Sequence, residues 1–136
     1  MSDTIKALTE TVRGRVIIAS DADYDDARAV YNAMHDRRPH AVVQCTDSAD
    51  VMAVIAAARD RGVDLAIRGG GHSVPGFGTV DDGLVIDLSP MKGVRVDPVK
   101  KVAWVGGGGI VGVVDDVAFR LGLVGAVGGC PPSGVG

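Results

Sequence analysis

The sequence is poor in aromatic side chains, in cysteine and in net charge. Aromatic residues make up 4% of the 136 residues, which leaves no stacking platform for single-stranded nucleic acid. A formal net charge of −3 provides no basic surface for DNA or RNA, so no nucleic-acid partner is expected. Two cysteines, Cys45 and Cys130, are too few for a disulfide framework, and we expect Cys45, which ends an apolar run, to be a buried small hydrophobe.

The sequence also lacks a segment that resembles a signal peptide or a membrane span. The first ten residues carry Asp3 and Glu10 and no apolar core of signal-peptide length. The longest charge-free stretches, 102–114 and 121–136, are short for a span and are interrupted by glycine or proline. We therefore expect a cytoplasmic protein with no membrane partner. The loop-like residues 133–136 suggest a truncated chain.

A metal centre is not expected either. His35 and His40 lie five residues apart across a turn-like stretch, and no cysteine or carboxylate cluster at ligand spacing accompanies them. We interpret both as solvated loop histidines.

Glycine, by contrast, is abundant. Twenty of the 136 residues are glycine, roughly twice the usual share of about 7%. Because 46% of the residues are hydrophobic, the excess indicates tight turns and close backbone approach, not disorder. The length corresponds to one domain with a buried core.

Apolar periodicity predicts alternating helices and strands. Asp47 is expected to cap a helix that Gly62 ends, with Asp50 favoured near its start by the macrodipole. The predicted helices cover 3–13, 47–61 and 111–121, together with a helix whose apolar residues repeat over 24–34 and which ends at 37–39. The predicted strands cover 15–19, 41–45, 63–67 and 84–88, with a hairpin formed by 93–97 and 100–105.

A glycine loop follows the strand predicted at 63–67, at the end where open α/β sheets usually bind ligands. It reads Arg68-Gly69-Gly70-Gly71-His72-Ser73. Consecutive backbone N–H groups in such a loop can form a nest for phosphate oxygens, and Arg68 would add a positive charge. His72 at the edge of the nest could serve as a nucleophile, acid, base or ligand. Taken alone, the motif also fits a flexible surface turn with an incidental histidine.

A second glycine-rich turn offers a different interpretation. Residues 107–112 satisfy G-x-G-x-x-G after a strand and before a helix, as in an NAD-binding Rossmann module. The preceding strand is predicted to be half of a hairpin, however, and no acidic residue lies about 20 residues further on to hold a ribose. This interpretation remains as an alternative.

Two segments resemble a known family. Residues 63–76 and 84–91, the latter Leu-Val-Ile-Asp-Leu-Ser-Pro-Met, are similar to the FAD-binding domain of the berberine-bridge-enzyme and vanillyl-alcohol-oxidase flavoproteins. The resemblance runs from about residue 14 to the last residue. It implies an α+β fold, a two-lobed FAD-binding domain of the PCMH type that is incomplete at the C-terminus. Residues 1–38 would then be a lead-in, and 39–136 the truncated domain, without the substrate domain.

The resemblance also assigns roles to individual residues. It places the FAD pyrophosphate on the glycine loop and makes His72 the covalent attachment point, through a methyl group of the flavin. Cys130 begins a Cys-Pro-x-x-Gly-x-Gly match and would form a second covalent bond, with a free loop thiol as the alternative. Ser133 stands where the family often has valine or leucine, which leaves oxidase or dehydrogenase behaviour open. The expected FAD-binding residues are Arg68, Gly69, Gly70, Gly71, His72, Ser73, Gly76, Gly128, Gly129, Cys130, Ser133, Gly134 and Val135.

The activity implied by the resemblance is that of a flavin-dependent oxidoreductase. Hydride would pass from an alcohol, sugar or amine carbon of a small-molecule substrate to FAD, and then to oxygen or another acceptor. The catalytic base is expected beyond residue 136, so the chain alone is expected to be inactive. A non-catalytic truncated fragment is the remaining alternative, and its exposed sheet edges would promote aggregation.

Overall fold

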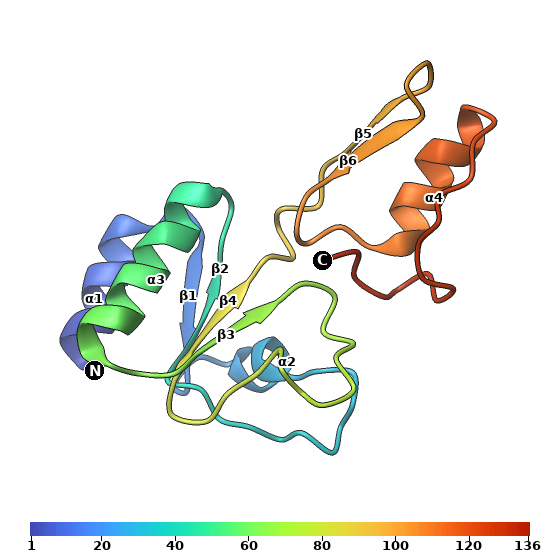
Figure 1. The fold of residues 1–136 in the computed structure, drawn as a ribbon. Helices are drawn as coiled ribbons and strands as arrows, with labels where there is room; N and C mark the ends of the chain where they lie inside the picture. The colour runs from blue at the N-terminus through green and yellow to red at the C-terminus, as the bar shows by residue number, and fades with distance from the viewer.

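A computed structural model describes residues 1–136 and contains one mixed sheet, one hairpin and four helices (Figure 1). The helices are α1 (Ser2–Thr11), α2 (Tyr24–Arg28), α3 (Ser48–Arg61) and α4 (Val111–Arg120). The strands are β1 (Arg15–Ile18), β2 (Ala41–Gln44), β3 (Leu65–Arg68), β4 (Leu84–Asp87), β5 (Val94–Asp97) and β6 (Val102–Val105). No helix is long and apolar enough to span a bilayer.

The sheet has the strand order β1-β2-β4-β3. β4 lies between β2 and β3 and is parallel to both, whereas β1 is antiparallel to β2. The register pairs Arg68 with Asp87, so β3 and β4 end at the same edge of the sheet. The glycine loop therefore leaves the sheet at the carboxyl ends of two parallel strands, as the sequence predicts.

Helices cover both faces of this sheet. α1 and α3 lie on one face and α2 on the other (Figure 1). Because successive strand side chains point to opposite faces, Val43 packs with the α1–α3 side and Val42 with the α2 side. Tyr24 anchors α2: its hydroxyl donates to the Pro39 carbonyl oxygen at 2.6 Å. The central strand β4 is buried along its whole length.

The ends of α3 are set by local chemistry. The Asp47 side chain accepts hydrogen bonds from the backbone N–H groups of Ala49 and Asp50, which satisfies two of the free donors of the first turn. Gly62 ends the helix with a φ of +63°, a conformation that glycine adopts without strain. The predicted cap at Asp47 and the predicted helix end at Gly62 are both confirmed.

α2 is shorter than its periodicity predicts. The predicted helix begins at 24 and ends at 37–39, but α2 ends at Arg28 and Ala29 is extended. The Arg28 guanidinium turns back to the carboxylates of Asp25 and Asp36, and the backbone N–H of Tyr31 donates to the Gly71 carbonyl oxygen. Contacts with the glycine loop thus replace helical hydrogen bonds in this segment.

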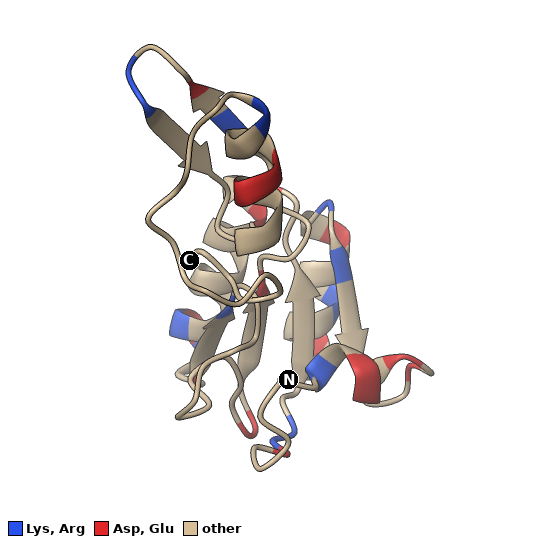
Figure 2. Cartoon of the chain, turned by 90° about the vertical axis from the view of Figure 1, so that its right-hand side faces the viewer, with Lys and Arg blue, Asp and Glu red and all other residues tan.

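The hairpin β5–β6 and helix α4 form a second unit beyond the carboxyl ends of β3 and β4 (Figure 1). β6 is antiparallel to β5 and has no parallel neighbour. A Rossmann turn requires a parallel β-α-β unit, so the NAD-binding interpretation of residues 107–112 is wrong. Charged residues of both signs are distributed along the chain, and the segment after α4 has none (Figure 2).

Candidate functional site

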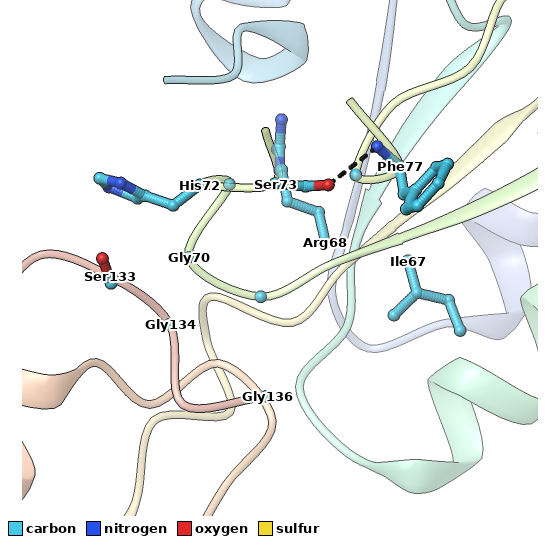
Figure 3. Close-up of a pocket in the computed structure, with 12 residues that line it drawn as sticks. Ile67, Arg68, Gly70, His72, Ser73, Phe77, Ser133, Gly134 and Gly136 are labelled. Atoms are coloured by element: carbon cyan, nitrogen blue, oxygen red, sulfur yellow. Dashed lines mark hydrogen bonds between the residues drawn. The ribbon is translucent and has the colours of Figure 1, made fainter. Parts of the chain in front are cut away.

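A pocket of about 350 Å³ lies against the glycine loop, between the two units (Figure 3). Residues 67–73 form one side of it, and Ser133, Gly134 and Gly136 form the opposite side. Half of the twelve lining residues are glycines, so backbone atoms make up much of the pocket wall.

The backbone donors of the loop have no partner within the chain. None of the N–H groups of residues 69–73 donates a hydrogen bond, whereas the carbonyl oxygens of Gly71 and Ser73 each accept one. The Ser73 hydroxyl accepts a hydrogen bond from the Phe77 N–H and so stabilises the turn that follows. Five consecutive donors without partners at a pocket wall fit an anionic group such as a phosphate.

The structure gives a second reason for the glycines. A Cβ atom at Gly70 would lie 2.2 Å from the Gly134 nitrogen, and one at Gly69 would lie 2.8 Å from the Gly107 oxygen. Gly71 has a φ of +72°, which disfavours any other residue. Glycine is therefore required at positions 69 and 70 by the close packing of neighbouring backbone, whether or not a ligand approaches the loop.

Arg68 has a different environment from the one expected. Its guanidinium donates to the Asp87 carboxylate at 3.1 Å and to the Ala29 carbonyl oxygen at 3.1 Å. Both charged side chains are buried, and Figure 3 shows Arg68 directed away from the Ser133–Gly136 segment. Asp87 therefore neutralises the positive charge that Arg68 was expected to bring to the nest.

His72 and Cys130, far apart in the sequence, line one cavity of about 420 Å³. Tyr31, Val74 and Ser133 contribute to the same cavity. The imidazole of His72 stacks on the Tyr31 ring with 4.2 Å between centroids and 17° between planes. The fold thus brings together both residues expected to bond the flavin.

Four of the residues expected to bind FAD line neither cavity: Gly76, Gly128, Gly129 and Val135. Gly76 has a φ of +76° and lies against the His35 ring, and the Val135 N–H donates to the Gly109 carbonyl oxygen at 3.0 Å. Gly128 and Gly129 directly precede Cys130 in the chain.

Tyr31 is not among the residues that the sequence indicates for the site. Its apolar spacing fits a helix, and no local pattern signals its contact with His72.

The two cysteines differ in exposure. Burial, with the nearby Asp50 carboxylate, raises the pKa of the Cys45 thiol to about 11, so Cys45 stays protonated near neutral pH. Cys130 is exposed at the cavity. Cys130 is therefore the thiol that a ligand in this cavity can meet.

Comparison with known proteins identifies relatives of this site. A family model described as an FAD binding domain matches residues 39–136. The chain is 32% identical over 124 residues to (R)-6-hydroxynicotine oxidase of Paenarthrobacter nicotinovorans, covering 91% of this chain and 27% of that protein. It is 37% identical over 110 residues to YgaK, an uncharacterised FAD-linked oxidoreductase of Bacillus subtilis, covering 81% of this chain and 24% of that protein.

Solved structures of flavoproteins are similar to this chain in fold. The crystal structure of 6-hydroxy-D-nicotine oxidase from Arthrobacter nicotinovorans matches with a TM-score of 0.88 and 31% identity, over 91% of this chain and 27% of that chain. The berberine-bridge-enzyme-like protein 1 of Physcomitrella patens matches with a TM-score of 0.88 and 29% identity, over 96% of this chain and 29% of that chain. The chain thus spans about a quarter of the length of the relatives that it matches. By family model, sequence and fold, it belongs to the FAD-binding domain family, with the α+β PCMH-type fold of the berberine-bridge-enzyme-like and vanillyl-alcohol-oxidase flavoproteins.

Proposed function

We propose that the chain binds FAD as part of a flavin-dependent oxidoreductase, with the pyrophosphate on the backbone of the glycine loop. The observation that carries this proposal is the run of five unpartnered N–H groups from Gly69 to Ser73 along the pocket wall. Phosphate oxygens would satisfy these donors without a charged side chain, because the Arg68 charge is already paired with Asp87.

His72 and Cys130 are the groups proposed to join the flavin covalently. The bond at His72 would link a ring nitrogen to a methyl carbon of the flavin. Its formation would remove one proton from that carbon, one proton from the imidazole and an electron pair. The flavin ring would take up all of these, and dioxygen would then receive the two protons and the electron pair as hydrogen peroxide. A bond from the Cys130 thiol to a ring carbon would have the same balance, with one proton lost from the thiol and one from that carbon. The shared cavity supports this assignment because both side chains reach the same space.

The substrate proposal rests on the relatives. One is named as a hydroxynicotine oxidase and another, with 26% identity, as a chitooligosaccharide oxidase. FAD, when bound, would accept hydride from an alcohol, sugar or amine carbon and pass the electrons to oxygen or another acceptor. This chain's residues would hold and orient the cofactor. Because the proposed base lies outside residues 1–136, the chain alone is proposed to bind FAD without turnover.

The test is covalent uptake of flavin. The purified 136-residue chain is incubated with FAD, denatured in acid and run on a gel that is read for flavin fluorescence. We expect fluorescence on the polypeptide, reduced by His72→Ala or Cys130→Ala and absent from the double variant. His40→Ala is the matched control because His40 lies outside both cavities, and circular dichroism confirms that each variant is folded.

Three results separate the parts of the proposal. Folded chain that binds no FAD contradicts the cofactor assignment. A chain that binds FAD but releases it in acid contradicts covalent attachment and leaves the cofactor assignment standing. Fluorescence that survives the double variant contradicts the assignment of the two residues.

A further inference from the structure

The Tyr31 ring stacks on the His72 imidazole at the edge of the cavity that also contains Cys130. The two ring centroids are 4.2 Å apart and the planes differ by 17°. A near-parallel partner covers one face of the imidazole, while both ring nitrogens stay at the edge of the ring and remain free to react.

Tyr31 is not held by the core. Tyr31 is 76% exposed, and its hydroxyl makes no hydrogen bond within the chain. The aromatic ring therefore does not contribute to core packing, and its one aromatic contact is with His72.

Hydrogen bonds to the glycine loop fix the place of Tyr31. The Tyr31 N–H donates to the carbonyl oxygen of Gly71 at 3.0 Å. Gly71 directly precedes His72 in the chain. The Asn32 amide donates to the Val74 carbonyl oxygen at 3.1 Å, and Nε2 of His35 contacts the same oxygen at 2.9 Å. These bonds flank His72 on both sides and align the two segments.

We propose that Tyr31 is a positioning residue that holds the His72 imidazole in the orientation from which its nitrogen joins the flavin. This inference rests on the proposed covalent attachment at His72, whose bond formation and electron transfer are those described above. His72 follows three glycines, so neighbouring side chains restrict its torsions little, and the stack supplies the restraint. An imidazole held at the cavity edge spends more of its time in a reactive geometry, which accelerates bond formation.

A first measurement needs no flavin. The ring current of Tyr31 shifts the His72 ring protons upfield in NMR spectra of the apo chain. Tyr31→Leu is expected to remove this shift, and Tyr31→Phe, which keeps the ring, is expected to retain it. A His72 shift that is unchanged in Tyr31→Leu would show that the stack is absent in solution and overturn the inference.

A second measurement follows the time course of covalent flavin uptake. We expect Tyr31→Leu to slow the rate about fivefold to tenfold, as loss of one aromatic stacking contact would. Tyr31→Phe is expected to keep the wild-type rate. Met34→Ala is the matched control, because Met34 lies in the same segment with its side chain 88% exposed.

Non-covalent affinity separates positioning from a structural role. In a background of His72→Ala with Cys130→Ala, Tyr31→Leu is expected to leave the dissociation constant for FAD unchanged. An equal fall in affinity and in uptake rate would show that Tyr31 only supports the fold, and it would overturn the inference. If Tyr31→Leu takes up flavin at the wild-type rate, the inference is overturned but the proposed function is not. If the wild-type chain forms no covalent bond to flavin at His72, both are overturned.

Discussion

Arg68 and Asp87 meet where β3 and β4 end, directly before the loop that is proposed to hold FAD. Their ion pair is buried, with side-chain exposures of 9% and 5%. Asp87 also accepts a hydrogen bond from the Ser89 N–H at 3.0 Å, so it closes the turn after β4 as well. Pairing of the two charges fixes the start of the glycine loop relative to the central strand.

Loss of one partner should leave an uncompensated buried charge. We expect Asp87→Ala to lower the free energy of unfolding by about 3 kcal/mol, measured by urea denaturation. Asp60→Ala is the control: Asp60 is an exposed helical carboxylate whose loss should cost less than about 0.5 kcal/mol. The double variant Arg68→Met with Asp87→Leu should recover part of the loss. Equal effects of Asp87→Ala and Asp60→Ala would contradict the role assigned to the pair.

Among the elements, α3 holds the N-terminal segment in place through Asp50. This carboxylate is 2% exposed and accepts hydrogen bonds from the backbone N–H groups of Arg13, Gly14 and Thr46 and from the Thr46 hydroxyl. The sequence explains Asp50 by the helix macrodipole alone. In the structure, Asp50 also connects the residues before β1 to the start of α3. Burial alone would raise the pKa of Asp50, but the hydrogen bonds outweigh it and hold the pKa below its usual range.

The lowered pKa of Asp50 predicts a dependence of stability on pH. A carboxyl whose pKa is lower in the folded state stabilises the fold above its unfolded pKa, about 3.9, and this contribution is lost as the pH falls through the folded value. At neutral pH, Asp50→Ala should lower the free energy of unfolding by about 3 kcal/mol because it leaves three backbone donors without a partner. The gap between wild type and Asp50→Ala in urea midpoint should therefore narrow below about pH 4. A gap that stays constant down to pH 2 would contradict this account.

Over the whole molecule, the two units meet through glycine backbones. The Val111 N–H donates to the Ser133 carbonyl oxygen at 2.9 Å and the Val135 N–H to the Gly109 carbonyl oxygen at 3.0 Å, which ties residues 133–136 to the start of α4. The same segment lies against Gly70 of the loop after β3. The proposed FAD pocket exists only where these loops converge.

Added volume at this junction should separate the loops. A Cβ atom at Gly134 would lie 2.5 Å from the Gly70 nitrogen, so Gly134→Ala should cost about 1–3 kcal/mol of stability and speed amide exchange at Val135. Gly129→Ala is the matched control because nothing lies within 4 Å of its added Cβ. Hydrogen exchange measured on both variants checks this. Unchanged protection at Val135 in Gly134→Ala would show that the added methyl group does not displace residues 133–136.

Much of the fold was predictable because its signals lie close together in the chain. Asp47 and Gly62 set the ends of α3 within one short window, and the turn at Asp97-Pro98 defines the β5–β6 hairpin. The extended end of α2 was not predictable. Apolar spacing up to Met34 fits a helix, but hydrogen bonds to residues 71 and 74 hold residues 31 and 32 in another conformation.

The sequence by itself determined the order of helices and strands, the place of the glycine loop after a strand, and the two motifs around His72 and Cys130. Each of these follows from residues adjacent in the chain or repeated at short intervals. Only the tertiary structure decided that Asp87 neutralises Arg68, that Tyr31 stacks on His72, and that neighbouring backbone leaves no room for a side chain at Gly69 and Gly70. The physical reason is that charge pairing, stacking and close packing depend on the partner that the fold brings near, and those partners lie 19 to 64 residues away in the chain.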